Sequence, residues 1–229
     1  MRKPASLSVG LRLLLASQAM APLSVKLGLV QQLGAEKAAL LAPHMPPGQL
    51  RELIMVMPIE FAAAVTTHLD PRLILDTYLS LPDSLHLEVA RQLCADGAFA
   101  TAALYAECLS AKQIKVLIYG INDVDHVLQI ARHIVDMPLI SESLRSFSTG
   151  YLCKLTEAAV VDRNLPVAAQ VLGGLSLARQ ADVCAGLQPA TLRKLLPLLL
   201  LKPPPRAPQP RATDRTQSAR RPGPRTGAR

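Results

Sequence analysis

Two histidines and two aspartates lie close together in the middle of the chain. His126 and His133 stand seven positions apart, and Asp123 and Asp125 come just before them. Imidazole and carboxylate groups bind metals, but two histidines that share one ion from a single helix normally stand four positions apart. Two helical turns are too wide for one ion. We therefore expect these side chains to be solvated or to cap a helix, with no metal site and no cofactor.

Other residue types that take part in catalysis lack suitable partners in the sequence. His44 and His68 each precede an apolar residue at a repeated position, so we expect a shared role in a turn, such as bonding a helix-end carbonyl. Glu60 and Glu88 have no second acid at a spacing that predicts an acid–base pair. The chain has no G-x-S-x-G motif, and the Gly-Gly pair at 173–174 lacks the lysine of a phosphate loop. We predict no catalytic residues and no enzyme activity.

The four cysteines are widely spaced. They form no C-x-x-C pair and no cysteine–histidine group, so local spacing builds neither a zinc site nor a thioredoxin-like motif. We expect buried thiols in a reducing compartment. The four are Cys94, Cys108, Cys153 and Cys184.

The positive charge is concentrated at the C-terminus. The whole chain has a net charge of +8, and residues 202–229 hold eight Lys or Arg against the single acid Asp214, a net +7. The rest is therefore nearly neutral. The tail could contact nucleic acid or an anionic surface without specificity, because it has no aromatic residue for base stacking. Equally, its composition could be without function. The candidate contacts are Arg206, Arg211, Arg215, Arg220, Arg221, Arg225 and Arg229.

The two ends of the chain differ in composition from the middle. Residues 1–21 form a basic segment that can be helical, and a cleaved signal peptide is the alternative. Arg12 interrupts its apolar run, so we expect no cleavage. Residues 202–229 lack large apolar side chains, which predicts disorder. No uninterrupted apolar stretch reaches about 18 residues, so we expect a cytoplasmic protein that is not an integral membrane protein.

Apolar residues recur every 12 positions, which indicates a structural repeat. Within the units the spacing is helical: Leu50, Leu53, Ile54 and Met57 lie at i, i+3, i+4 and i+7. We call the recurring apolar positions the phase residues. They are Leu33, Met45, Met57, Leu69, Leu81 and Leu93, then Leu109 and Ile121, then Leu175, Leu187 and Leu199.

Proline and aspartate mark the starts of the predicted helices. A proline follows several phase residues by one or two positions, where a first-turn proline loses no helical hydrogen bond. Asp70, before Pro71, is expected to cap a helix. Each 12-residue unit therefore predicts one short helix and a tight turn, and two units make a hairpin. The prolines are Pro47, Pro58, Pro71, Pro82 and Pro189.

A longer repeat, with an offset of 66 residues, relates residues 87–110 to residues 153–176. In both segments a helix is expected to end near an aspartate, at Asp96 or Asp162, and an alanine-rich helix follows. Residues 113–121 are rich in Ile, Val and Tyr and could form a strand. We predict a helix there, because Ile114 to Ile121 matches Leu50 to Met57 in pattern.

The 12-residue pattern resembles the cytoplasmic N-terminal superhelical domain of MgtE-type magnesium transporters, and the flagellar motor switch proteins have a similar-looking fold. The segments His68-Leu69-Asp70-Pro71-Arg72 and Ser80-Leu81-Pro82-Asp83 carry the resemblance, which covers residues 22–134 and, less clearly, 150–200. It implies a superhelix and perhaps a regulatory partner. That family's domain is acidic and precedes a CBS pair and a channel. This near-neutral chain lacks clustered oxygen ligands, so we expect no transport and no retained magnesium sensing.

Together these patterns predict an all-α protein. We expect a right-handed superhelix, or α-solenoid, of short helical hairpins over residues 22–201, followed by the disordered tail. Such a stack leaves an extended surface. We predict a scaffold or regulatory module that binds a protein partner or a second copy of itself, with nucleic-acid binding through the tail as the alternative.

Overall fold

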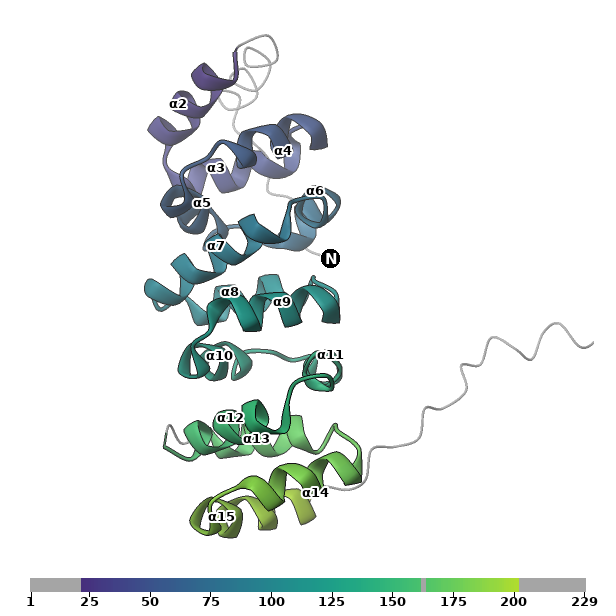
Figure 1. Cartoon of the computed structure of the whole chain (residues 1–229). Helices are drawn as coiled ribbons and strands as arrows, with labels where there is room; N and C mark the ends of the chain where they lie inside the picture. The colour runs from purple at the N-terminus through teal and green to yellow at the C-terminus, as the bar shows by residue number, and fades with distance from the viewer. Residues whose placement is uncertain (1–21, 162–163, 202–229) are drawn as a thin grey trace, which may run out of the picture.

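The computed structural model describes residues 22–161 and 164–201, and this part of the chain is all-helical. Its 14 α-helices and two 3₁₀ helices are stacked in chain order, from α2 at one end to α15 at the other (Figure 1). The elements are α2 (Leu23–Leu33), α3 (Ala35–Leu41), η1 (Ala42–His44), α4 (Pro47–Met55), α5 (Ile59–Thr66), η2 (Pro71–Ile74), α6 (Leu75–Leu79), α7 (Asp83–Ala95), α8 (Phe99–Ala106), α9 (Ala111–Ile121), α10 (Val124–Ala131), α11 (Met137–Leu144), α12 (Thr149–Val161), α13 (Leu165–Leu172), α14 (Leu177–Gly186) and α15 (Pro189–Leu200).

The 12-residue period is the spacing between successive helix starts. Two longer steps interrupt it, from Asp83 to Phe99 and from Thr149 to Leu165, because α7 and α12 are each 13 residues long. The 66-residue offset connects the same elements. Shifted by 66, α7 coincides with α12 at both ends, and α8 coincides with α13. The predicted helical repeat is confirmed. Helices begin 12 residues apart at Leu23, Ala35, Pro47, Ile59, Pro71 and Asp83.

Most phase residues lie in the turns between helices rather than on a helical stripe. They stand two positions before the first residue of the next helix, where an apolar side chain packs against the helix it precedes. Leu93 and Leu199 differ, because they lie inside α7 and α15. Phe147, two positions before α12, occupies the same place although the period did not identify it. The turn residues are Met45, Met57, Leu69, Leu81, Leu109, Leu175 and Leu187, all buried except the half-buried Met45.

Helix starts carry the expected proline and aspartate signals, with one difference. Pro47, Pro71 and Pro189 are the first residues of their helices, whereas Pro58 and Pro82 occupy the N-cap position. Both positions tolerate the missing N–H, since neither needs a helical hydrogen bond from it.

Two predictions about local structure are confirmed. The Asp70 carboxylate accepts a hydrogen bond from the backbone N–H of Arg72, 3.0 Å away, and so caps η2. Residues 111–121 form helix α9, and the Ser110 hydroxyl and Gln113 side chain make a reciprocal capping box at its start. The capping box favours the helix despite the β-branched residues that follow.

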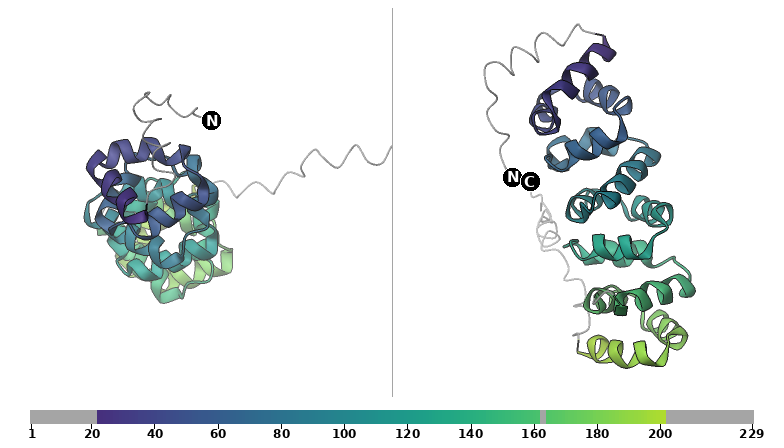
Figure 2. Two further views of the ribbon diagram at one scale, coloured as in Figure 1. Left: turned by 90° about the horizontal axis from the view of Figure 1, so that it is seen from above. Right: turned by 90° about the vertical axis from the view of Figure 1, so that its left-hand side faces the viewer.

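Helices two apart in the chain pack against each other and form the rows of the stack. The contacts run from α3 through α5, α7, α9, α11 and α13 to α15, and from α8 through α10 and α12 to α14. Figure 2 shows the same column from its end and from its side. Helix α4 packs on α2 and α6, while α9 packs on α7 and α11. The two helices matched in the sequence, α4 and α9, therefore belong to different rows.

The interior divides into two clusters of buried apolar residues. The smaller cluster runs from Val30 to Ile74, and the larger runs from Ala63 to Leu195. Helix α6 lies near their junction and, at five residues, is the shortest α-helix of the described chain. Each cluster is filled mainly by aliphatic side chains, which pack helices through ridges and grooves.

Several predictions fall on residues outside the described ranges. These are the helical character of residues 1–21, the disorder of residues 202–229 and the seven arginine contacts in that tail. None of the described helices has the length and apolar character that crossing a lipid bilayer requires.

Candidate functional site

The histidine–aspartate group at 123–133 forms a helix cap. Asp123 accepts hydrogen bonds from the backbone N–H groups of Asp125 and His126, at 2.9 and 3.1 Å, and so begins α10. Its other carboxylate oxygen lies 3.5 Å from His126 Nδ1. His133 is exposed on the far side of the helix end. Within the described ranges, no group of three or more His, Cys, Asp or Glu residues could hold a metal ion.

The other candidate acid–base residues lie apart on the surface. His44, His68, Glu60 and Glu88 are all exposed. The hydrogen bonds of the described residues include none from either histidine ring, so the expected bond to a helix-end carbonyl is not formed there. The sequence suggested these residues because of their type, and the fold does not bring them together.

The four cysteines are free thiols with suppressed acidity. Burial raises the pKa of Cys94 to about 11 and also raises the pKa of the other three above the ordinary value. Cys153 Sγ lies 3.5 Å from the Val183 carbonyl in the neighbouring repeat. Because the thiolate is the reactive form, these cysteines act as small packing residues.

Arginines tie neighbouring repeats together by donating to backbone carbonyls about 30 residues away. Arg91 Nε lies 3.2 Å from the Gly120 carbonyl, and Arg51 Nε lies 3.4 Å from the Ser80 carbonyl. Arg179 donates to the Phe147 carbonyl and to the Thr149 hydroxyl. The acceptors lie at or beside helix ends, where carbonyls have no helical partner and positive charge is favourable.

Glutamates perform the complementary task at helix starts. Glu107 Oε1 accepts from the backbone N–H of Val135 at 2.6 Å, just before α11, and its other oxygen pairs with Arg72 at 3.2 Å. Glu157 Oε1 accepts from the backbone N–H of Gln188 at 2.7 Å, at the start of α15. Carboxylates are stabilising at helix N-termini. These charged groups therefore fix the register of one repeat on the next.

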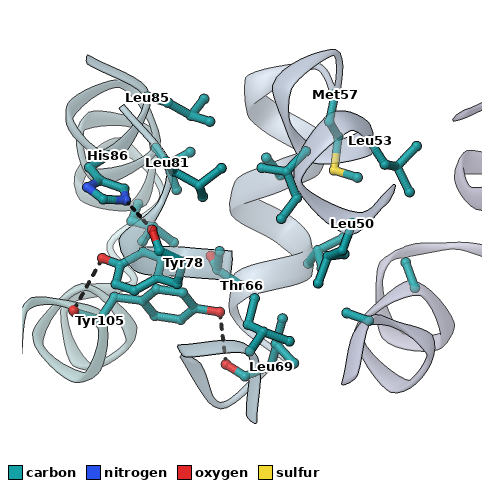
Figure 3. Close-up of a pocket in the computed structure, with 18 of the residues that line it drawn as sticks. Leu50, Leu53, Met57, Thr66, Leu69, Tyr78, Leu81, Leu85, His86 and Tyr105 are labelled. Atoms are coloured by element: carbon teal, nitrogen blue, oxygen red, sulfur yellow. Dashed lines mark hydrogen bonds between the residues drawn. The ribbon is translucent and has the colours of Figure 1, made fainter. Parts of the chain in front are cut away.

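An interior cavity of about 100 Å³ lies between the two core clusters. It is partly open, and its walls come from both clusters (Figure 3). Leu50, Leu53 and Met57 face Leu81 and Leu85 across it in the close-up. The wall is almost entirely apolar, so this cavity could not concentrate charged groups for catalysis.

The polar groups in the cavity wall bind one another. The Tyr78 hydroxyl donates to the Tyr105 carbonyl at 3.2 Å, and the Tyr105 hydroxyl donates to the Leu69 carbonyl at 3.0 Å. His86 Nε2 lies 3.0 Å from the Tyr78 carbonyl. Burial lowers the pKa of His86 and raises the pKa of both tyrosines. The imidazole is therefore neutral, and its Nε2–H donates to the carbonyl.

The pattern of the sequence contained a signal for His86 that was not used. His86, Ala90 and Leu93 lie at i, i+4 and i+7 on α7, so a histidine stands on the buried stripe of that helix. Tyr78 and Tyr105 offered no comparable signal, because their mutual geometry depends on how α6 and α8 approach each other. Their rings meet edge to face with centroids 5.2 Å apart.

Five exposed apolar side chains gather on neighbouring elements near the N-terminal end of the stack. We call them the α4–α6 surface. Helices α4 and α6 pack against each other, and η2 leads directly into α6. Each of the five side chains is 37–45% exposed, which is high for large aliphatic residues on three adjoining elements. They are Met55, Val56, Leu73, Leu75 and Leu79.

Comparison with known proteins identifies no relative. No family model matches the chain, and neither a curated protein nor a solved structure is significantly similar to it. The geometry of the described residues therefore carries the functional argument alone.

Proposed function

We propose that this protein is a non-enzymatic helical-repeat scaffold or regulatory module that binds a protein partner in the cytoplasm. The α4–α6 surface is the observation that carries the proposal. Protein partners bind through apolar patches bordered by polar residues, and exposed Arg51, Glu52 and Asp76 border this patch.

The distribution of charged groups supports the same proposal. Arg91, Arg179, Glu107 and Glu157 are engaged in fixing neighbouring repeats, which maintains the shape of the stack. Each repeat packs only on its neighbours, so a long lateral surface remains available to a partner. Rigid helices hold exposed side chains in place, and a preorganised surface loses less entropy on binding.

The resemblance to the N-terminal domain of MgtE-type transporters adds an analogy for a regulatory role. It rests on the 12-residue pattern around Leu69 and Leu81, which coincides with helix starts in this fold. Fold similarity alone does not specify a function. We therefore propose partner regulation without magnesium sensing, since the body is nearly neutral.

The proposed function predicts that charge placed on the α4–α6 surface abolishes partner binding. The double variant Met55→Asp/Leu79→Asp should recover a specific partner from native lysate at least tenfold less than the natural protein, because buried unpaired carboxylates oppose association. The measurement is quantitative cross-linking and pull-down, with sedimentation beforehand to detect self-association. Circular dichroism checks that the variant is folded.

Leu177→Asp serves as the matched control, because Leu177 is 82% exposed on α14, outside the α4–α6 surface. It should recover the same partner at the natural yield. Equal recovery by the double variant and the control would refute the assignment of this surface. A measured small-molecule turnover would count against the scaffold itself.

The concentration of charge in residues 202–229 favours a second candidate, nonspecific binding of nucleic acid or an anionic surface. A net +7 in 28 residues is enough to neutralise several phosphates. We expect the full chain to shift duplex DNA in a gel, with affinity rising steeply as salt falls. Deleting residues 202–229 should remove the shift. An unchanged shift after deletion would exclude the tail as the binding element.

A further inference from the structure

We propose that the cavity between the two core clusters binds one small uncharged apolar molecule, no larger than about a single aromatic ring. This site is distinct from the α4–α6 surface, so the inference goes beyond the proposed scaffold function.

The cavity exists because small side chains stand where helices of the two clusters face each other. Ala38, Ala42 and Ala62 form one wall, and Ala102 and Ala106 belong to the opposite wall. The short helix α6 crosses near this junction. Larger residues at these positions would fill the space, as they do elsewhere in a tightly packed interior.

The polarity of the wall selects an apolar occupant. The hydroxyls of Tyr78 and Tyr105 already donate to protein carbonyls, and the Thr66 hydroxyl donates to the Ala63 carbonyl at 2.6 Å. His86 Nε2 donates to the Tyr78 carbonyl, and the other ring nitrogen lies away from Leu50 and Leu53 across the cavity (Figure 3). Water needs two to four polar partners to be stable in a cavity, so water is disfavoured here.

The size of the cavity limits the occupant further. A dry apolar cavity of about 150 Å³ binds benzene in another protein, and this one measures about 100 Å³. It therefore suits a ring-sized hydrocarbon and is too small to enclose a long acyl chain. A charged molecule would lose its hydration without gaining a partner from the wall.

Two methionines allow the cavity to adapt to such a molecule. Met45 and Met57 both line it, and the methionine side chain is unbranched and polarisable. Met45 is half-buried, as are Thr66 and Leu85, so part of the wall reaches the surface. A small molecule can therefore enter by side-chain motion without unfolding a repeat.

Methionine-methyl NMR of the full-length protein, titrated with benzene, tests the site. The methyl signals of Met45 and Met57 should shift in a saturable manner. Met55, exposed on α4, and Met137, at the start of α11, line no part of this cavity and should shift several-fold less. Equal shifts at Met55 would show surface adsorption and overturn the proposal, as would the absence of saturable shifts.

A cavity-filling variant supplies the second readout. Benzene at ten times its Kd should raise the Tm of the natural protein by about 3–6 °C. Ala62→Leu, which places a larger side chain in the cavity, should bind benzene at least tenfold more weakly. Ala64→Leu, on the same helix but outside the cavity wall, should bind it normally. Benzene bound equally by Ala62→Leu and the natural protein would overturn the assignment.

Thr66→Leu covers the case in which Ala62→Leu does not fold. Thr66 lines the partly exposed edge of the cavity, and its hydroxyl bonds only within its own helix. The larger side chain should again weaken benzene binding at least tenfold while a methionine-methyl spectrum reports a folded chain. A smaller cavity of about 60 Å³ lies around Leu128 and Leu144. Loss of binding only when that second cavity is filled would overturn the proposal.

Discussion

Phe147→Ala should lower the free energy of unfolding by about 3–5 kcal/mol, the usual loss for deleting a fully buried aromatic side chain. Phe147 is 1% exposed in the larger core cluster. Its ring stacks on Tyr119 with centroids 4.4 Å apart and contacts Tyr151 at 4.8 Å. Because Phe147 also stands two positions before α12, the substitution removes the apolar anchor of that helix. Urea unfolding monitored by circular dichroism measures the loss.

Leu177→Ala provides the control for Phe147, since its side chain is 82% exposed. It should change stability by no more than about 0.5 kcal/mol. A double-mutant cycle with Tyr119→Ala should show a coupling of about 0.5–1.5 kcal/mol from the stacked rings. If Phe147→Ala costs less than about 1 kcal/mol, the ring is not packed as described.

Gly174→Ala should destabilise the protein by about 1–3 kcal/mol, because even one methyl group does not fit there. A Cβ on Gly174 would lie 2.1 Å from Ser141 Oγ and 2.6 Å from Ser141 Cβ. Ser141 is buried in α11 and has its own acceptor, the Val171 carbonyl at 3.3 Å. Thermal and urea unfolding of the variant measure the cost.

A companion substitution separates this contact from a general preference for glycine. Ser141→Gly removes both atoms that the new methyl would meet, so the double variant should lose less stability than the two single variants together. Gly150→Ala, where a Cβ would meet nothing within 4 Å, should be neutral or slightly stabilising. Strict additivity of Gly174→Ala and Ser141→Gly would contradict the close approach.

The 12-residue period predicted the fold well because it arises from local geometry. A short helix, a turn and one apolar residue before the next helix require about that many positions, so the period could be seen in Met57, Leu69 and Leu81. The period was lost where a helix is longer. Helix α12 is 13 residues long, and Phe147 therefore went unrecognised as the equivalent of Leu81. Single helix lengths are not encoded in a period.

The candidate surface and cavity could not be predicted to the same extent. Their members are ordinary aliphatic residues, such as Met55 and Leu79 outside and Leu53 and Met57 inside, and the sequence does not distinguish the two sets. The sorting depends on which rows of helices meet. The chemistry-bearing residues selected from the sequence, including His44 and His133, proved to lie apart on the surface.

The separation of the core into two clusters gives the molecule a seam. Between Ile74 and Leu93 the neighbouring units share a cavity instead of continuous packing, and the Tyr78–Tyr105 and His86–Tyr78 hydrogen bonds bridge it. Under heat or tension the column should part there first, with helices α2–α5 melting as one block while the remainder stays zipped. Hydrogen exchange should therefore proceed in two steps rather than one.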